Sequence, residues 1–77
     1  MTFQEYFHQA NRFFIENKND QRYGQALMNY LRKISPIAYH GVMFADNIDP
    51  FYDDNLVPEF LNYLSNNWTE LTRPENS

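Results

Sequence analysis

Hydrophobic residues recur at steps of three and four along most of this chain, which is the spacing of one side of an α-helix. In the first such segment they are Phe3, Tyr6, Phe7, Ala10, Phe13 and Phe14. Thr2 stands just before this segment and Glu5 three residues later. This is the spacing of a capping box, in which each side chain accepts a backbone N–H of the other residue. The pattern predicts a helix that starts after Thr2 and ends near Asn17.

A second segment with the same periodicity follows the polar run 16–21. Its hydrophobic positions are Tyr23, Ala26, Leu27, Tyr30, Leu31 and Ile34. Asp20 is a suitable cap for the start of this helix, and Arg32 and Lys33 lie in its last turn, where cations complement the helix dipole. We therefore expect a second helix that ends at about Ile34.

Ser35-Pro36 ends one helix and starts another, because proline cannot continue a helix but suits the first position of a new one. A short third helix is expected over 36–44, then a loop over 46–55, and a final helix from about Leu56 to Trp68. No segment alternates with a period of two, so no strand is predicted. The fold class is therefore all-α: a bundle of three to four helices with an aromatic-rich core, comprising a single domain over 1–70 and a flexible tail over 71–77.

Composition supports one small domain. Of the 77 residues 18% are aromatic, which compensates for the small core of so short a chain. Cysteine is absent, so neither a disulfide nor a thiolate metal site can form, and no apolar run reaches the roughly 18 residues that cross a bilayer. We expect a protein of the cytoplasm, without membrane contact.

The residues needed for catalysis or cofactor binding are scarce. With Gly24 and Gly41 as the only glycines there is no glycine-rich phosphate loop, and two histidines are too few for a histidine-based zinc site. No base is expected beside any serine. The acidic loop 46–55 does not fit a calcium-binding EF-hand, because Ile48 stands where an oxygen ligand is needed and Phe51 where a glycine is needed, although weak calcium binding stays open. The sequence predicts a non-enzymatic protein without a cofactor or metal.

Charge is distributed unevenly along the chain. Residues 1–33 contain five Lys or Arg and three Asp or Glu, whereas residues 34–72 contain six acids and no Lys or Arg. Direct nucleic-acid binding is not expected, since it depends on cations that meet phosphates. The acidic half favours a protein partner with a basic surface, with solubility alone as the simpler explanation of its charge.

Some apolar residues fall outside the core stripes of their helices. Ile15, Met28 and Tyr63 should be partly exposed, and with Phe44 or Tyr52 they would form aromatic anchors beside a charged rim, as in protein-binding hot spots. The acids have a second interpretation, in which Asp49 caps a helical turn led by Pro50 and Asp54 or Asn55 caps the last helix. Phe51 is expected in the core and Tyr52 at the surface. The candidate partner-binding residues are Phe44, Asp46, Asp49, Tyr52, Asp53, Asp54, Glu59 and Tyr63.

Two stretches, RYGQALMNYL at 22–31 and DPFYDDNLVPEFLNYL at 49–64, resemble parts of a group of short proteins encoded by bacteriophages and bacteria. In that group Arg-x-Gly-Gln-Ala opens a helix, and Asp-Pro-Phe-Tyr precedes a closing helix that ends near a Trp. The matching residues here are Arg22, Gly24, Gln25, Ala26, Asp49, Pro50, Phe51, Tyr52 and Trp68. The resemblance implies an accessory protein of a mobile genome and brings no assigned activity with it. Residues 35–47 are more apolar than the group leads us to expect, and this member could specialise there.

These observations together predict a small acidic protein-binding module, of phage origin, that inhibits or modulates a host or defence protein in the host cytoplasm. The alternative is a structural subunit that assembles with copies of itself, so that another copy covers the exposed apolar residues.

Overall fold

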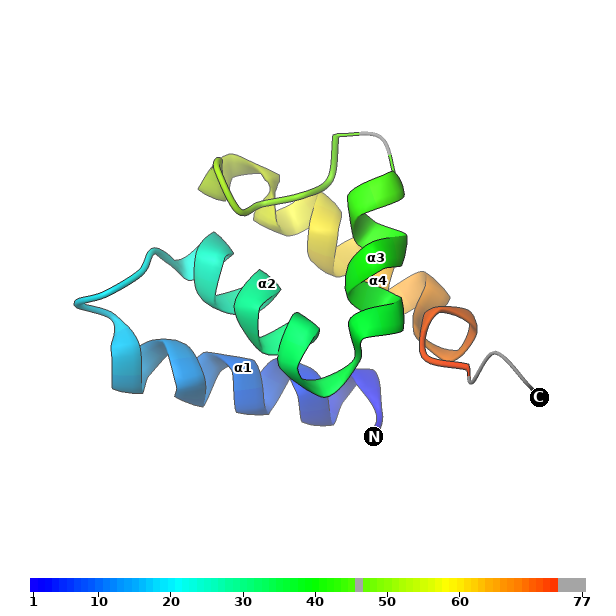
Figure 1. Ribbon diagram of the computed structural model, residues 1–77, viewed down its shortest axis with the longest axis horizontal. Coiled ribbons are helices and arrows are strands. Elements are labelled where there is room, and N and C mark those ends of the chain that lie inside the picture. Colours follow the sequence, from blue (N-terminus) through cyan, green and yellow to red (C-terminus); the bar gives the residue numbers. More distant parts are fainter. Residues whose placement is uncertain (46, 74–77) are drawn as a thin grey trace.

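The computed structural model describes residues 1–45 and 47–73, and within these ranges it contains helices but no strand. The elements are α1 (Phe3–Asn17), α2 (Tyr23–Ile34), α3 (Pro36–Phe44), a short 3-10 helix η1 (Asp54–Leu56) and α4 (Val57–Leu71). Helices α1 and α2 lie side by side, and α3 stands in front of α4 (Figure 1). The prediction of a small all-α bundle is confirmed.

The predicted starts of α1 and α3 are correct. At α1, the Glu5 N–H donates to Thr2 Oγ1 at 3.1 Å, and the Thr2 N–H donates to Glu5 Oε1 at 2.8 Å. The hydrogen bond that the Thr2 N–H donates to the carboxylate lowers the pKa of Glu5. At α3, the Ala38 N–H donates to Ser35 Oγ at 3.2 Å, with Pro36 in the first turn. Both helices are therefore started by residues adjacent in the sequence, as the pattern indicated.

The predicted cap of α2 is wrong. The helix begins at Tyr23, with Arg22 rather than Asp20 in the N-cap position. Gly24 lies in the first turn, where a backbone N–H has no acceptor within the helix. Its N–H donates to Asp54 Oδ1 at 2.9 Å, and Asp54 lies 30 residues further along the chain. A tertiary contact thus performs the capping that we expected from a local residue.

The boundaries of α4 also differ from the prediction. Neither Asp54 nor Asn55 caps the helix, because both belong to η1, which leads directly into α4. The helix continues one turn beyond Trp68 to Leu71, and the Thr72 hydroxyl donates to the Trp68 carbonyl at 2.7 Å. The predicted domain boundary at residue 70 therefore lies inside the last turn of α4, and residues 74–77 of the predicted tail lie outside the described residues.

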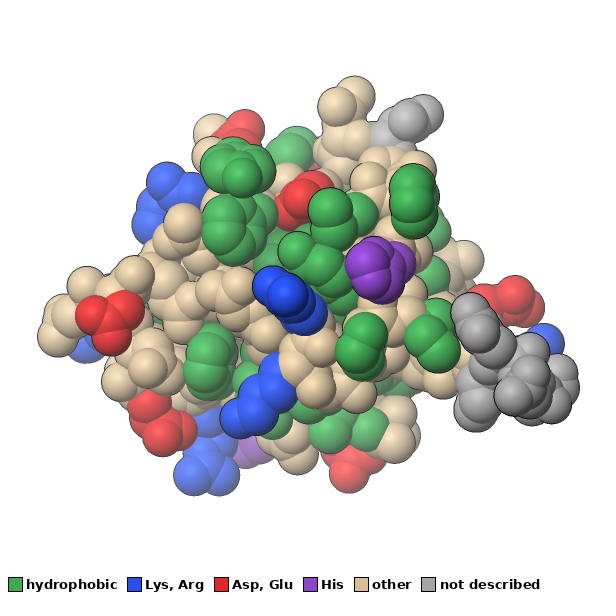
Figure 2. All heavy atoms as spheres, in the orientation of Figure 1, with side chains coloured by type: hydrophobic (Ala, Val, Ile, Leu, Met, Phe, Trp, Pro, Cys, Tyr) green, Lys and Arg blue, Asp and Glu red, His purple; other side chains and the backbone are tan. Residues whose placement is uncertain are grey.

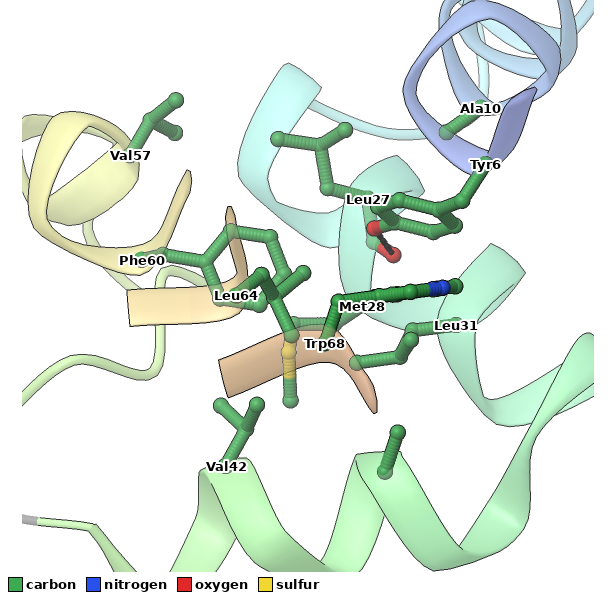
Figure 3. Close-up of a cluster of buried hydrophobic side chains, with 11 residues drawn as sticks. Tyr6, Ala10, Leu27, Met28, Leu31, Val42, Val57, Phe60, Leu64 and Trp68 are labelled. Atoms are coloured by element: carbon green, nitrogen blue, oxygen red, sulfur yellow. Dashed lines mark hydrogen bonds between the residues drawn. The ribbon is translucent and has the colours of Figure 1, made fainter. Parts of the chain in front are cut away.

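The core is a cluster of side chains from all four α-helices (Figure 3). The Trp68 indole stacks on the Tyr6 ring, with 5.3 Å between their centroids. The Tyr6 hydroxyl donates to the Leu27 carbonyl at 2.7 Å, and Trp68 Nε1 donates to the Met1 carbonyl at 2.8 Å. Burial raises the pKa of the Tyr6 hydroxyl, which therefore stays neutral in the folded protein. The polar atoms of the two largest core rings are thus satisfied by backbone carbonyls.

Met28, expected to be partly exposed, is only 1% exposed. The expectation assumed that α2 buries one side, but α2 contacts α1, α3 and η1 and so buries most of its circumference. The Met28 side chain lies in the core with residues of α3 and α4 (Figure 3). Ile15 is 64% exposed, as predicted, while Tyr63 is partly exposed and packs against the core cluster.

Within the described residues, no helix has the length and apolar character needed to cross a membrane.

Candidate protein-interaction surface

The loop after α3 is locked onto the start of α2. The Arg22 guanidinium donates through Nη2 to the Phe51 carbonyl at 2.7 Å, while the Gly24 N–H binds Asp54. A Cβ on Gly24 would overlap the Pro50 carbonyl oxygen and lie 2.7 Å from Asp54 Oδ1. Gly24 is therefore required for the close approach of the loop backbone to α2.

This contact joins the two sequence motifs that carry the resemblance to phage proteins. Arg22 and Gly24 belong to the first motif, and Pro50 and Phe51 to the second. Pro50 is fully buried and Phe51 packs against the core. The motif residues that meet here hold the fold together, so this part of the resemblance concerns architecture more than partner contact.

The carboxylates of the loop are largely engaged by the protein itself. Asp49 accepts the Phe51 N–H and Asp53 accepts the Asn55 N–H, both at 2.9 Å. Asp54 accepts the Gly24 N–H and lies 3.9 Å from Arg22 Nε. The capping role predicted for Asp49 in the turn at Pro50 is thus confirmed, whereas Asp54 binds the start of α2 and not the last helix, which it was predicted to cap.

The other predicted site residues occupy different environments. Glu59 is exposed in the first turn of α4, whereas Tyr63 is partly buried against the core. Asp46 lies outside the described residues. In the part of the chain that is described, no three His, Asp or Glu side chains gather closely enough to hold a metal ion.

Two of the candidate aromatic residues are strongly exposed, as predicted. Phe44 is 87% exposed at the end of α3, and Tyr52 is 82% exposed in the loop. The neighbouring Phe51 ring, 4.9 Å from that of Tyr52, is half-buried against the core. Phe51 and Tyr52 therefore divide between core and surface as the sequence suggested.

Phe44 is part of a larger apolar surface on α3. Ala38 and Val42 bury one side of the helix, while the opposite side is exposed to solvent. We call this exposed side the α3 face; its residues are Pro36, Ile37, His40, Met43 and Phe44. Ile37, His40 and Phe44 follow the spacing i, i+3, i+7, so they lie along one line of the helix.

Ile37 and Met43 were missing from the predicted site. The signal that could have found them is the run 34–45, which contains no Asp, Glu, Lys or Arg although it includes a whole surface helix. A helix that is hydrophobic all round cannot bury every side against a single small core. Part of α3 therefore had to be exposed.

Cations lie beside the α3 face. The Arg32 guanidinium carbon is 5.8 Å from the centroid of the Tyr39 ring of α3. Arg32 and the exposed Lys33 form the end of α2, directly before α3 begins. Figure 2 shows hydrophobic side chains and a histidine over α3, with Lys and Arg side chains next to them over the end of α2.

A hollow between α1 and α2 is a weaker candidate for a binding site. It is lined by Gln9, Arg12, Phe13, Glu16, Tyr30 and Lys33. The Tyr30 hydroxyl already donates to Gln9 Oε1 at 2.7 Å, and the Lys33 ammonium lies 5.9 Å from the Tyr30 ring centroid. These polar groups therefore bind one another.

Fold and surface together define a small all-α domain whose third helix is packed on one side and presents an uncharged, apolar side to solvent. Comparison with known protein families, with curated proteins and with solved structures gives no match to the chain. The resemblance to phage accessory proteins accordingly stays a prediction from the sequence motifs.

Proposed function

We propose that this protein is a non-enzymatic protein-binding module that contacts its partner through the α3 face. The observation that carries the proposal is the exposure of Ile37, Met43 and Phe44 on a helix without a single charged residue. Contiguous apolar surface of this kind is rare on monomeric proteins and is typical of interaction sites. Large rings such as Phe44 supply much of the binding energy when a partner buries them.

The role proposed for the module is to inhibit or modulate a host or defence protein in the cytoplasm of a phage host. Its support is the resemblance of the Arg22 and Asp49 motifs to short phage-encoded proteins, together with the α3 segment, which is more apolar than that group leads us to expect. Arg22 and Gly24 of the first motif contact Phe51 and Pro50 of the second inside the fold, whereas the α3 segment exposes several apolar side chains to a partner.

A photocrosslinking experiment tests the proposal. A photoreactive phenylalanine analogue replaces Phe44 in one protein and Ile15, exposed at the far end of α1, in a matched control. Each is irradiated in bacterial lysate. We expect one protein to be crosslinked in stoichiometric amount from position 44 and not from position 15. Equal labelling from both positions, or none from position 44, would contradict the proposal.

Self-assembly is the alternative function, and the charge distribution favours it. The positively charged residues 1–33 of one copy complement the negatively charged residues 34–72 of another. Sedimentation at micromolar concentration separates the two functions. A monomer at every concentration argues against assembly, whereas dimers that dissociate after Phe44→Glu support it.

A further inference from the structure

We infer that the α3 face binds an amphipathic helix of a partner protein that carries carboxylates beside its apolar residues. The inference rests on the proposed function and adds the chemistry of the partner. It differs from the basic partner that net charge alone suggested.

The shape of the α3 face favours a helix. Its exposed residues Ile37, His40 and Phe44 lie in a line with the spacing of helix–helix contacts, and Met43 widens that line at one end. A second helix packs against such a ridge with 8–10 Å between axes. The nine residues of α3 extend about 13 Å, which matches two to three turns of a partner helix.

The charges next to the α3 face favour carboxylates on that helix. The Arg32 guanidinium lies over the Tyr39 ring of α3, whereas the Lys33 ammonium lies over the Tyr30 ring at the hollow between α1 and α2. Between Lys33 and Asp46 the chain carries no charged residue, so these two cations are the nearest charges in sequence on the N-terminal side of α3. A partner carboxylate near Arg32 would fix the register of an otherwise apolar contact.

The acids that suggested a basic partner are positioned less well for that purpose. Asp49, Asp53 and Asp54 each accept a backbone N–H of this chain. Glu59 belongs to the first turn of α4 rather than to α3. Three acids of this half are thus already paired with backbone N–H groups of the chain itself.

The test uses two synthetic peptides of about 16 residues, long enough for measurable helix content. Both have Leu and Phe at positions i, i+3, i+4 and i+7, with Glu at the flanking positions in one and Lys in the other. Binding to the whole protein is measured by fluorescence anisotropy at low and moderate salt. We expect the Glu peptide to bind about tenfold more tightly than the Lys peptide, with the difference decreasing as salt rises.

Two exposed-site variants assign the binding to the α3 face. Phe44→Ala should weaken binding of the Glu peptide about tenfold, as expected for an aromatic anchor. Arg32→Glu should reverse the preference, so that the Lys peptide becomes the tighter ligand. Circular dichroism checks that both variants keep their helices, and Ile15→Ala is the matched control that should bind like the original protein.

Three results would overturn the inference: no binding of the Glu peptide, tighter binding of the Lys peptide by the original protein, or binding that Phe44→Ala does not change. If a partner is crosslinked from position 44 while the peptides show any of these results, the proposed function stands and only the partner chemistry is wrong. If position 44 crosslinks no partner, the proposed function itself fails.

Discussion

Helices α2 and α3 are consecutive and joined by a single residue, yet they use their hydrophobic side chains in different ways. Helix α2 buries Ala26, Leu27, Met28 and Leu31 and exposes mainly polar side chains. Helix α3 buries only Ala38 and Val42 and exposes Ile37, Met43 and Phe44. Apart from Tyr39, which packs against the core, the larger apolar side chains of α3 are therefore the ones that contribute least to it.

The difference separates residues that stabilise the fold from residues available for binding. A side chain buried in α2 or α4 gains its full transfer free energy on folding, whereas an exposed side chain on the α3 face gains little until a partner covers it. Pairs of the same residue type, one packed and one exposed, therefore measure the distinction directly.

Phe60 and Phe44 should show the largest difference in their effects on the free energy of unfolding. Phe60 is fully buried, so Phe60→Ala should lower the free energy of unfolding by about 3–5 kcal/mol, enough to unfold much of a domain this small. Phe44→Ala should change it by less than about 0.5 kcal/mol. Urea denaturation followed by circular dichroism measures both. Similar losses in the two variants would show that the α3 face is part of the core.

The two glycines form the second pair. Gly24→Ala places a methyl group against the Pro50 carbonyl, and we expect a net loss of about 1–3 kcal/mol despite the better helix propensity of alanine. At Gly41 the new Cβ would meet only the end of the Leu71 side chain, at 2.6 Å. Since that side chain can rotate, Gly41→Ala should stay within about 1 kcal/mol of the original protein. Thermal unfolding compares them, and a stabilising Gly24→Ala would refute the close approach of the loop.

Tyr6 makes the stability of the fold depend on alkaline pH. Burial raises the pKa of Tyr6, so the unfolded chain loses this proton first, near its ordinary pKa of about 10. The contribution of Tyr6 to the free energy of unfolding is complete below that pH. Above it, the free energy of unfolding decreases by up to about 1.4 kcal/mol per pH unit. Tyr6→Phe should reduce this decrease, whereas Tyr52→Phe, at an exposed ring, serves as the control. Urea titrations between pH 8 and about 11 measure how the free energy of unfolding changes with pH. The same change with pH in the original protein and in Tyr6→Phe would argue against Tyr6 as its cause.

Asp54 and Asp20 test which acid caps α2. Asp54→Ala removes the acceptor of the Gly24 N–H and should cost about 1 kcal/mol, the usual value of an N-cap. Asp20→Ala should have almost no effect, because Asp20 is exposed and lies before the N-cap residue Arg22. The reverse order of effects in urea denaturation would restore the local cap that the sequence suggested.

Much of the fold follows from local patterns. The periodic apolar positions, Thr2–Glu5 and Ser35-Pro36 predicted the ranges of α1, α2 and α3 because they act over one or two helical turns. The end of α4 was placed too early, since the helix continues until Leu71 and its C-cap at Thr72, where the apolar periodicity is weak. Local signals thus determine where most helices begin and leave some ends open.

The candidate site was harder to predict. Exposure of Phe44 and Tyr52 was foreseen, but Ile37 and Met43 were missed and Met28 was expected to be partly exposed although it is buried. Whether a helical side is buried depends on how many neighbouring elements surround the helix, and α2 has neighbours on several sides. A helical wheel contains no information about those neighbours.

The sequence by itself determined an all-α chain with a ring-rich core, a charge imbalance between its halves and an uncharged third helix, because periodicity, capping and composition are properties of neighbouring residues. Only the tertiary structure decided that Asp54 caps α2, that Met28 is buried and that the α3 face lies beside Arg32. These contacts join elements from different parts of the chain, and they exist only once the helices have packed around the common core.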